Sequence, residues 1–552
     1  MVLVLLLVFL VLGLVLAWFL IRVWYFRLVA RSRAQVRHQD GQTVPGQIPK
    51  LLVGNMVDVY RSPNRLSAYH HFHEKFGEIV QIFWMWRQQI SVTNYRMVRQ
   101  ILVLRQRNYE KFRPNWLIQR LYGSSVLTNS GEDWKRQRLL MNEVFSKKHI
   151  DGFHDIFVSY SEGLADKWDK SADKSGATAP FDIYPDLIGL FLDIIGKTAI
   201  GHHFGALAGE ADAFLESLNY ILKQSTQPLY QFTTWWRHLP LPANRRLARA
   251  FETVDDFLNA LIRERKEMNA HSVPEAYNVL DLFLQATNFV ADDVPPLTDG
   301  EVRDNLLAII VNGHETVATS VSLALYLLAR DPEKLGHAQA EVDRLMEGDN
   351  GQLTKAGVSG LHYLEGVVNE SLRVYPPMSG LQRISVDADV LEGWSIPSKQ
   401  VVGIPLTPLH MDSQYFGECP EEFRPERYLD EDQTPAPASI ALEEDSQEKC
   451  PMSGTDVPGE GGKRRTTNNV RLPLTFGGGS RKCLGRAFAM YEMKVALAVL
   501  LHRFDFRVTP DFDVNPELGK FGLFISMFPK GGVHLVIGRR DREQPSADQT
   551  PT

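Results

Sequence analysis

The hydrophobic residues of this chain follow different patterns in different parts of the sequence. Residues Met1 to Ile21 are almost entirely apolar and contain no charged side chain. From Tyr95 to about Leu345 apolar residues recur mostly at a spacing near 3.6, which predicts a series of amphipathic helices. Glu78 to Met85 and Ile90 to Thr93 are short β-prone runs that we expect to pair as strands. Residues 523–537, centred on a Pro-Lys-Gly-Gly turn, predict a second hairpin.

The apolar amino terminus predicts a transmembrane helix. A helix over residues 1–21 would be about 30 Å long, which matches the hydrocarbon core of a bilayer. The aromatic residues Trp18, Trp24 and Tyr25 cluster toward its carboxyl end, where interfacial aromatics are expected. Five arginines follow the apolar run: Arg22, Arg27, Arg31, Arg33 and Arg37. By the positive-inside rule, the side that carries these arginines stays in the cytosol.

A cleaved signal peptide is the alternative interpretation of this segment. It is disfavoured because no basic residue precedes the apolar run, the run is too long, and no small-x-small cleavage site follows it. We therefore predict a single-pass signal anchor in the endoplasmic reticulum membrane, with the rest of the chain facing the cytosol.

Composition excludes several classes of protein. The 552 residues carry a net charge of -6, which gives no support for nucleic-acid binding. There are three cysteines, Cys419, Cys450 and Cys483, and none forms a Cys-x-x-Cys pair. A small, odd number of cysteines argues against a disulfide framework, and the missing pairs argue against a zinc or iron–sulfur site.

Composition also predicts how the chain is divided. After the anchor at 1–21, residues 22–44 form a basic linker, and the folded domain is expected from 45 to 540. Residues 431–469 are rich in Pro, Gly, Ser, Thr and acidic side chains, which predicts a mobile insertion within that domain. The tail at 541–552 is predicted to be disordered.

The residues with the clearest chemical signal surround Cys483. This cysteine lies at the exit of a glycine-rich loop, directly before a strongly helical apolar segment. Backbone N–H groups and the positive end of the helix dipole would stabilise its thiolate, and Arg481 would add positive charge. Such a sulfur can ligate iron, and thiolate ligation of haem favours cleavage of the O–O bond. A buried structural cysteine beside a tight turn is the alternative, and for this loop alone it would be preferred.

A second signal lies within the long apolar segment Asp304 to Arg330. A second transmembrane span is disfavoured, because the polar run Asn312 to Thr316 interrupts its centre and polar groups are costly in hydrocarbon. Polar groups inside a buried helix indicate a functional site instead.

The cysteine loop resembles the haem-binding signature of the cytochrome P450 superfamily, F-x-x-G-x-R-x-C-x-G. Phe476, Gly479, Arg481, Cys483 and Gly485 fill every defined position of that signature. The resemblance implies that Cys483 is the iron ligand.

The central helix is similar to the oxygen-activation motif of the same family. Glu315 and Thr316 match the acid and alcohol that deliver protons during the reduction of dioxygen. Asn312 departs from the usual small residue, and His314 is interpreted as a packing residue.

Two further motifs strengthen the resemblance. Glu370 and Arg373 match the family's E-x-x-R, and Arg427 matches the arginine of its P-E-R motif; the family places these three residues in a buried structural network. Taken alone, an E-x-x-R pair usually lies on a solvated helix face.

A W-x-x-x-R pattern indicates further haem contacts. Trp134 and Arg138 match the family helix that binds a haem propionate, and Arg383 and Arg481 are the other expected propionate ligands. Arginine suits a carboxylate because its fork donates two parallel hydrogen bonds. Individually, Trp134 and Arg138 are ordinary residues of an amphipathic helix.

The four motifs occur in the family's order, and the resemblance covers roughly residues 45–540. It implies a cytochrome P450 fold that is mainly α with a smaller β-rich region, preceded by one N-terminal transmembrane helix. The implied activity is a haem-thiolate monooxygenase that contains haem b and inserts one oxygen atom from O2 into a lipophilic substrate. Electrons would come from a separate NADPH-dependent flavoprotein reductase, with cytochrome b5 as a further partner.

Two alternatives stay open at this point. One is a P450-type isomerase or dehydratase that needs no external electrons, and the other is a non-catalytic haem-binding protein. Both are disfavoured by the intact Glu315–Thr316 pair. The substrate pocket is expected on segments rich in large apolar residues: Phe112 to Val126, Tyr230 to Leu239, Ile309 to Gly313, Met378 to Leu381 and Phe521 to Phe528.

Overall fold

The computed structural model of the chain forms two compact units. Unit 1 comprises Met1–Phe112, Ser379–Glu421 and Asp432–Lys482, and unit 2 comprises Arg113–Met378, Glu422–Glu431 and Cys483–Thr552. The insertion predicted at 431–469 and the tail at 541–552 lie outside the residues that the structure describes. Those residues are 2–33, 35–62, 65–85, 87–112, 115–172, 176–210, 212–225, 227, 230, 235–271, 278–285, 294–349, 351–429, 473–508, 521–523, 526–529 and 531–540.

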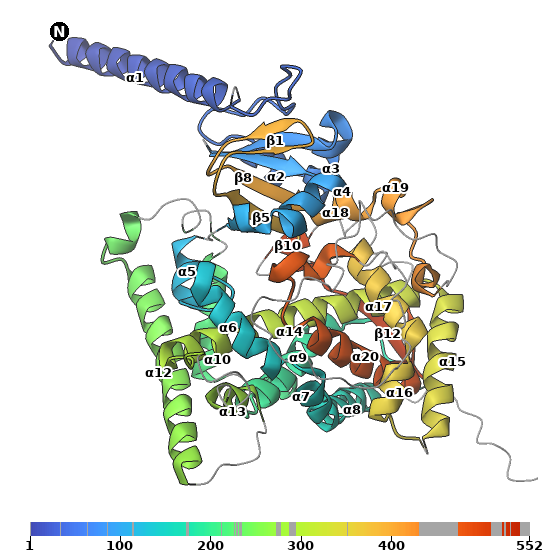
Figure 1. Cartoon of the computed structure of the whole chain (residues 1–552). Helices are drawn as coiled ribbons and strands as arrows, with labels where there is room; N and C mark the ends of the chain where they lie inside the picture. Colours follow the sequence, from blue (N-terminus) through green and yellow to red (C-terminus); the bar gives the residue numbers. More distant parts are fainter. Residues whose placement is uncertain are drawn as a thin grey trace, which may run out of the picture. The chain divides into compact units, whose positions relative to one another are not determined.

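Unit 1 is built on a five-stranded sheet (Figure 1). The strands lie in the order β1-β2-β8-β5-β3, with β2 parallel to β8 and every other pair antiparallel. The predicted pairing near residues 78–93 is confirmed, because Ile79 lies opposite Val92 in β1 and β2. The strands are β1 (Ile79–Trp84), β2 (Arg87–Val92), β3 (Tyr109–Lys111), β5 (Gly380–Ser385) and β8 (Val401–Pro405).

Short helices and a small hairpin complete unit 1. The hairpin of β6 (Asp389–Leu391) and β7 (Trp394–Ile396) turns at Glu392 and Gly393, which both have positive φ, as a tight two-residue turn requires. The helices are α1 (Val2–Arg33), α2 (Met56–Arg61), α3 (Arg65–Phe76), α4 (Tyr95–Arg99), α18 (Leu406–His410) and α19 (Ser413–Phe416).

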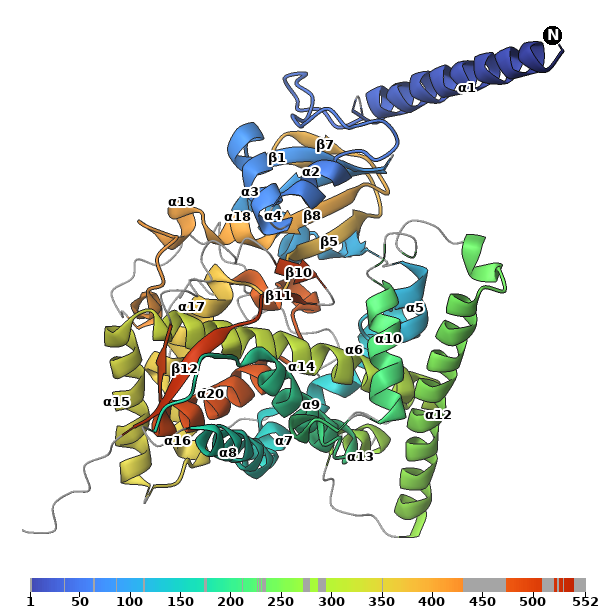
Figure 2. The ribbon, with the colours of Figure 1, turned by 180° about the vertical axis from the view of Figure 1, so that it is seen from behind.

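Helix α1 has two different surroundings along its length. Its amino-terminal part extends away from the sheet of unit 1 in both views (Figures 1 and 2), and large apolar side chains such as Leu14 and Trp18 are exposed. Tyr25, by contrast, is 0% exposed and donates hydrogen bonds from its hydroxyl to the carbonyls of Lys50 (2.8 Å) and Met85 (3.1 Å). The helix therefore continues through the first part of the segment that the sequence suggested as a linker, and its last turns belong to the folded unit.

Unit 2 is mainly helical and surrounds the long helix α14 (Asp299–Ala329). Thr298 and Glu301 begin this helix with a reciprocal capping box, and nearly all of its apolar side chains are buried. Helices α9 (Tyr184–Ile200), α17 (His362–Val374) and α20 (Arg486–Arg503) pack against it. The remaining helices are α5 (Trp116–Tyr122), α6 (Gly131–Val144), α7 (Lys147–Gly152), α8 (His154–Ser171), α10 (Ala213–Ser225), α12 (Pro242–His271), α13 (Val279–Leu284), α15 (Pro332–Gly348) and α16 (Lys355–Gly360).

Among the described residues, two helices are long and apolar enough to cross a membrane, judged by length and composition. They are Leu12–Arg33 of α1 and all of α14. Most of α14 is buried inside unit 2, as the polar run at its centre led us to expect.

Two small sheets complete unit 2, and they correct the second predicted hairpin. Strand β10 (Phe521–Leu523) pairs with β11 (Met527–Pro529), whereas β12 (His534–Arg539) lies between β4 (Phe181–Asp182) and β9 (Phe504–Arg507). The hairpin prediction across residues 529–532 was therefore wrong. Contacts distant in sequence decide the pairing of β12, because Asp182 Oδ1 accepts from the amide of Val533 at 2.8 Å. The predicted fold class, mainly α with smaller sheet regions, is confirmed.

Candidate functional site

The glycine-rich loop is held in shape by steric limits that only glycine meets. Gly477 and Gly479 have φ of 75° and 65°. A Cβ atom at Gly479 would lie 1.9 Å from the carbonyl oxygen of Leu102, so no other residue fits there. The amide of Ser480 donates to Gln106 Oε1 at 3.0 Å, which ties the loop to an earlier segment of unit 1.

Cys483 follows this loop and begins the last part of unit 2. Its thiol is exposed, and it lies just before Gly485, the residue that precedes α20. The helix amino terminus favours a thiolate at this position. Phe476 is half-buried at the end of the short turn Leu474–Phe476, and Gly485 has room for a larger group beside its Cα, since no atom lies within 4 Å of a built Cβ.

Arg138 lies near Cys483. It projects from α6, one turn after Trp134, and both side chains are half-buried. Burial lowers the pKa of the Arg138 guanidinium, while the charge of the nearby Cys483 acts in the opposite direction. No residue that the structure describes forms a hydrogen bond or ion pair with the Arg138 side chain, which leaves its donors available for an anionic group.

Arg383 in unit 1 is also a buried cation for which the described residues supply no carboxylate. Its side chain in β5 is 6% exposed, and burial lowers its pKa to about 10. Its one hydrogen bond to a described residue goes to the carbonyl oxygen of its neighbour Gln382, at 3.0 Å. A buried cation without a counter-ion is costly. Arg481, half-buried in the turn Gly479–Arg481, is a second cation of unit 1. In unit 2, the exposed Cys483 thiol can ligate iron and the nearby Arg138 can bind a carboxylate, so the residues around Cys483 fit a haem.

The predicted acid and alcohol lie on α14 as adjacent residues. Glu315 is buried and accepts a hydrogen bond from the amide of Ser526 at 3.3 Å. Thr316 is half-buried and donates from Oγ1 to the carbonyl of Asn312 at 2.7 Å. His314 is buried and bonds through Nδ1 to the carbonyl of Ile310 at 2.7 Å, and burial lowers its pKa. This satisfied position agrees with its interpretation as a packing residue.

The structure brings Glu370, Arg373 and Arg427 together in a buried cluster. Arg373 donates to both oxygens of Glu370 at 2.8 Å, and Arg427 Nε donates to Oε1 at 3.1 Å. The amide of Arg424 also reaches Oε1 at 3.0 Å, and Arg373 further donates to the carbonyl of Glu422. The cluster links α17 to the turn at residues 425–428 and contains no group free to perform chemistry.

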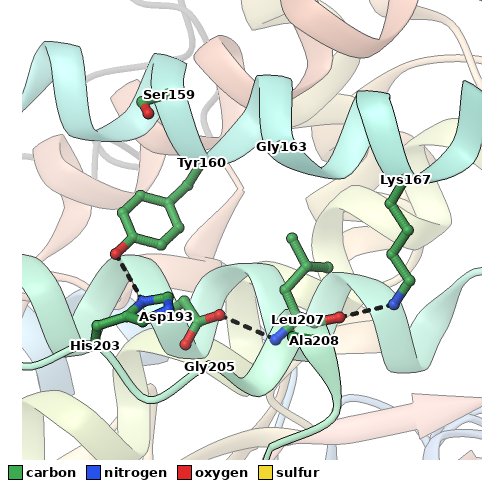
Figure 3. Close-up of a pocket in the computed structure, with 9 residues that line it drawn as sticks. All are labelled: Ser159, Tyr160, Gly163, Lys167, Asp193, His203, Gly205, Leu207 and Ala208. Carbon is green, nitrogen blue, oxygen red and sulfur yellow. Dashed lines mark hydrogen bonds between the residues drawn. The ribbon is translucent and has the colours of Figure 1, made fainter.

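A surface pocket of about 420 Å³ lies elsewhere in unit 2, between α8, α9 and the segment 203–208 (Figure 3). Its polar side chains mostly bind one another or the backbone. Tyr160 Oη contacts His203 Nδ1 at 3.0 Å, Asp193 accepts from the amides of Ala206 and Leu207, and Lys167 pairs with Asp186. None of the predicted site residues lines it, so we assign it no role in the reaction.

Comparison with known proteins identifies the family of this chain. The family model described as "Cytochrome P450" matches residues 44–535. The chain belongs to the cytochrome P450 family. This P450 is 27% identical to "Cytochrome P450 97B2, chloroplastic" of Glycine max, over 83% of this chain and 81% of that protein. It is also 26% identical to "Cytochrome P450 4d2" of Drosophila melanogaster (91% and 95% covered) and to "Cytochrome P450 3A9" of Rattus norvegicus (90% and 92%).

Membership establishes the general chemistry of this P450. The family consists of haem-thiolate oxygenases, in which a cysteine ligates the haem iron and a redox partner supplies electrons for the reduction of O2. Lipophilic substrates are the rule in the family.

Sequence reasoning missed several residues that position the site of this P450. Asp304 Oδ2 accepts from the amide of Ser124 at 2.6 Å, and Asn305 Oδ1 accepts from Val126 at 2.8 Å, which holds the segment after α5 on α14. Tyr184 Oη lies 3.3 Å from Thr319 Oγ1, one turn beyond Glu315. No local pattern marks these contacts. The acidic and amide residues at the start of α14 are the one readable signal, because polar side chains there are unusual for a buried helix.

Proposed function

We propose that this P450 is a membrane-anchored monooxygenase that inserts one oxygen atom from O2 into a lipophilic substrate. The observation that carries the proposal is the acid–alcohol pair of buried Glu315 and half-buried Thr316 on α14, within the unit that also holds Cys483. Reduction of O2 consumes two protons in each turnover, which an acid–alcohol pair can supply, whereas isomerisation or loss of water takes up no protons overall and a non-catalytic haem protein performs no reaction.

The proposed cofactor is haem b. Cys483 would ligate its iron, and Gly485, which has open space beside its Cα, would leave room next to that cysteine. Gly479 would keep the loop in its shape, because no larger residue fits against Leu102. Trp134, Arg138, Arg383 and Arg481 would hold the propionates. The haem supplies the activation of dioxygen when bound.

The remaining residues supply protons and rigidity. Thr316 Oγ1 donates to the carbonyl of Asn312 and can at the same time accept a hydrogen bond, and Glu315, the preceding residue, is the proposed acid that supplies protons. Glu370, Arg373 and Arg427 would keep the neighbouring core rigid and take no part in proton transfer.

The proposed location is the endoplasmic reticulum membrane, with α1 as the single span and the rest of both units in the cytosol. Support comes from the exposed apolar residues of Leu12–Trp24 and from the arginines that follow. The proposed electron donor at this membrane is an NADPH-dependent flavoprotein reductase, with cytochrome b5 as a second donor.

Isotope labelling tests the reaction class. The full-length holoprotein in phospholipid nanodiscs would be given lipids selected by their shift of its absorbance spectrum, together with ¹⁸O2, NADPH and purified reductase. We expect one ¹⁸O atom in the product and no product when reductase or NADPH is omitted. Product formation without reductase would favour the isomerase alternative. Haem binding with neither product nor NADPH consumption would favour the non-catalytic one.

A further inference from the structure

We propose that Asn312 and Tyr122 form a hydrogen-bonding site for a hydroxyl group of the substrate, so that this P450 selects lipophilic alcohols over hydrocarbons of the same skeleton. The inference rests on the proposed monooxygenase function and names the substrate class of that site. It begins with Asn312, the one position at which α14 departs from the family's oxygen-activation motif.

The orientation of the Asn312 amide is fixed by its neighbours. Nδ2 donates to the carbonyl oxygen of Ala308 at 2.7 Å and to Tyr122 Oη at 3.2 Å. A flipped amide would place two acceptor oxygens against each other at Ala308, so the nitrogen must occupy this side. The carbonyl oxygen Oδ1 then points away from both partners.

Each member of the pair keeps one unused hydrogen-bonding group. Both donor hydrogens of Asn312 are occupied, but no residue that the structure describes donates to its Oδ1. The Tyr122 hydroxyl accepts from Asn312, yet its own hydrogen finds no acceptor within the described part of the chain. Tyr122 is buried and Asn312 is half-buried. An unmatched acceptor and an unmatched donor thus lie side by side, and leaving such groups unpaired is unfavourable.

The pair lies beside the reacting region. Asn312 and Thr316 are one turn apart on the same face of α14, and the Thr316 hydroxyl donates to the Asn312 carbonyl. The carboxylate of Glu315 is close enough to act on the Tyr122 hydroxyl, because its charge adds to the burial that raises the pKa of Tyr122.

The position of Tyr122 is also rigidly defined. The next residue, Gly123, has φ of 44°, and a Cβ there would lie 2.1 Å from Asp304 Oδ2. The same carboxylate binds the amide of Ser124, and Asn305 binds that of Val126. This docking onto the first turns of α14 holds the Tyr122 hydroxyl at Asn312, as a preorganised recognition site requires.

A hydroxyl is the simplest group that satisfies both residues. Its oxygen can accept from Tyr122, and its hydrogen can be donated to Asn312 Oδ1. A ketone or methyl ether can only accept, so it would leave Oδ1 unpaired. A hydrocarbon would leave both groups unpaired, and sites built to bind a hydroxyl discriminate strongly against analogues that lack it.

Binding measurements with matched probes test the proposal. Full-length holoprotein in nanodiscs would be titrated with dodecanol, methyl dodecyl ether and dodecane, and with farnesol, farnesyl methyl ether and farnesene, following heat and absorbance. For at least one skeleton we expect the alcohol to bind roughly tenfold or more tightly than its ether and hydrocarbon. Tyr122→Phe and Asn312→Ala should each remove most of this preference while leaving hydrocarbon affinity nearly unchanged.

Tyr160→Phe is the matched control, because it removes a hydroxyl from the surface pocket of the same unit and should preserve the preference. Equal affinity for alcohol and hydrocarbon on both skeletons, binding of neither alcohol, or an unchanged preference in Tyr122→Phe and Asn312→Ala would overturn the proposal. The isotope-labelling experiment tests the monooxygenase function independently of this site. An alcohol preference without ¹⁸O incorporation would contradict the monooxygenase function but would still support the hydroxyl-binding site.

Discussion

Replacing Arg373 by alanine should destabilise unit 2 strongly and prevent stable haem incorporation. Arg373 and Glu370 are both 0% exposed, and two hydrogen bonds of 2.8 Å join them. Removing one partner of a buried ion pair typically costs about 3–5 kcal/mol, because the other charge stays in a medium that solvates it poorly.

The structure places this substitution at the lower end of that range. After the loss of Arg373, Glu370 still accepts from Arg427 at 3.1 Å and from the Arg424 amide at 3.0 Å, so one counter-ion remains. We therefore expect a loss of about 3 kcal/mol. Glu370→Ala should cost more, about 5 kcal/mol, because it strands two buried guanidinium groups, and Arg427→Ala should cost less, about 1.5–3 kcal/mol.

Urea denaturation followed by tryptophan fluorescence, together with haem content per chain, measures this order. Arg539→Ala is the matched control, because Arg539 pairs with Asp169 at 2.5 Å on the surface of the same unit, with both side chains exposed. That change should cost less than about 1 kcal/mol. If Arg373→Ala had the urea midpoint and haem content of Arg539→Ala, the network would not have the structural role assigned to it.

The remaining predictions concern proton delivery, the anchor helix and pH. Thr316→Ala should bind substrate normally yet divert NADPH-derived electrons to hydrogen peroxide, and unchanged coupling of NADPH to product would exclude Thr316 from the relay. Tyr25→Ala should destabilise unit 1 by about 3–5 kcal/mol, because it removes a buried ring. Tyr25→Phe loses only the hydrogen bonds to Lys50 and Met85 and should cost about 1 kcal/mol. Equal urea midpoints for both variants and the parent would contradict the packing of α1 on unit 1. Burial lowers the pKa of His73 to about 4, below its ordinary 6.5, so the unfolded chain takes up a proton first as pH falls. Stability should therefore be flat above about pH 6.5 and fall by up to about 3 kcal/mol toward pH 4, and His73→Gln should reduce that fall; an equal slope in the variant would refute the assignment.

Some parts of the site could be predicted because the residues are close in sequence. The glycine loop and Cys483 are contiguous, and Glu315 and Thr316 are neighbours on one helix, so local pattern and family resemblance sufficed. The partnership of Glu370 with Arg427 spans 57 positions and came from the resemblance alone.

Other parts depend on contacts that no local pattern encodes. Asn312 and Tyr122 are 190 positions apart, and only the docking of the segment after α5 onto α14 brings them together. The hairpin predicted across residues 529–532 failed because β12 gains two neighbouring strands from distant parts of the chain. Helix α1 continues to Arg33 because Tyr25 and Val29 find a buried site against Phe83, which the amino-terminal sequence does not reveal.

The identity of the iron ligand is the most direct test of the account. The reduced carbon monoxide complex of the parent holoprotein should show the red-shifted Soret band of thiolate-ligated haem. Cys483→Ser should lose that band, whereas Cys419→Ser, which changes another exposed cysteine, should retain it. A red-shifted band that persists in Cys483→Ser would contradict the assignment of Cys483, and with it the site built around that residue.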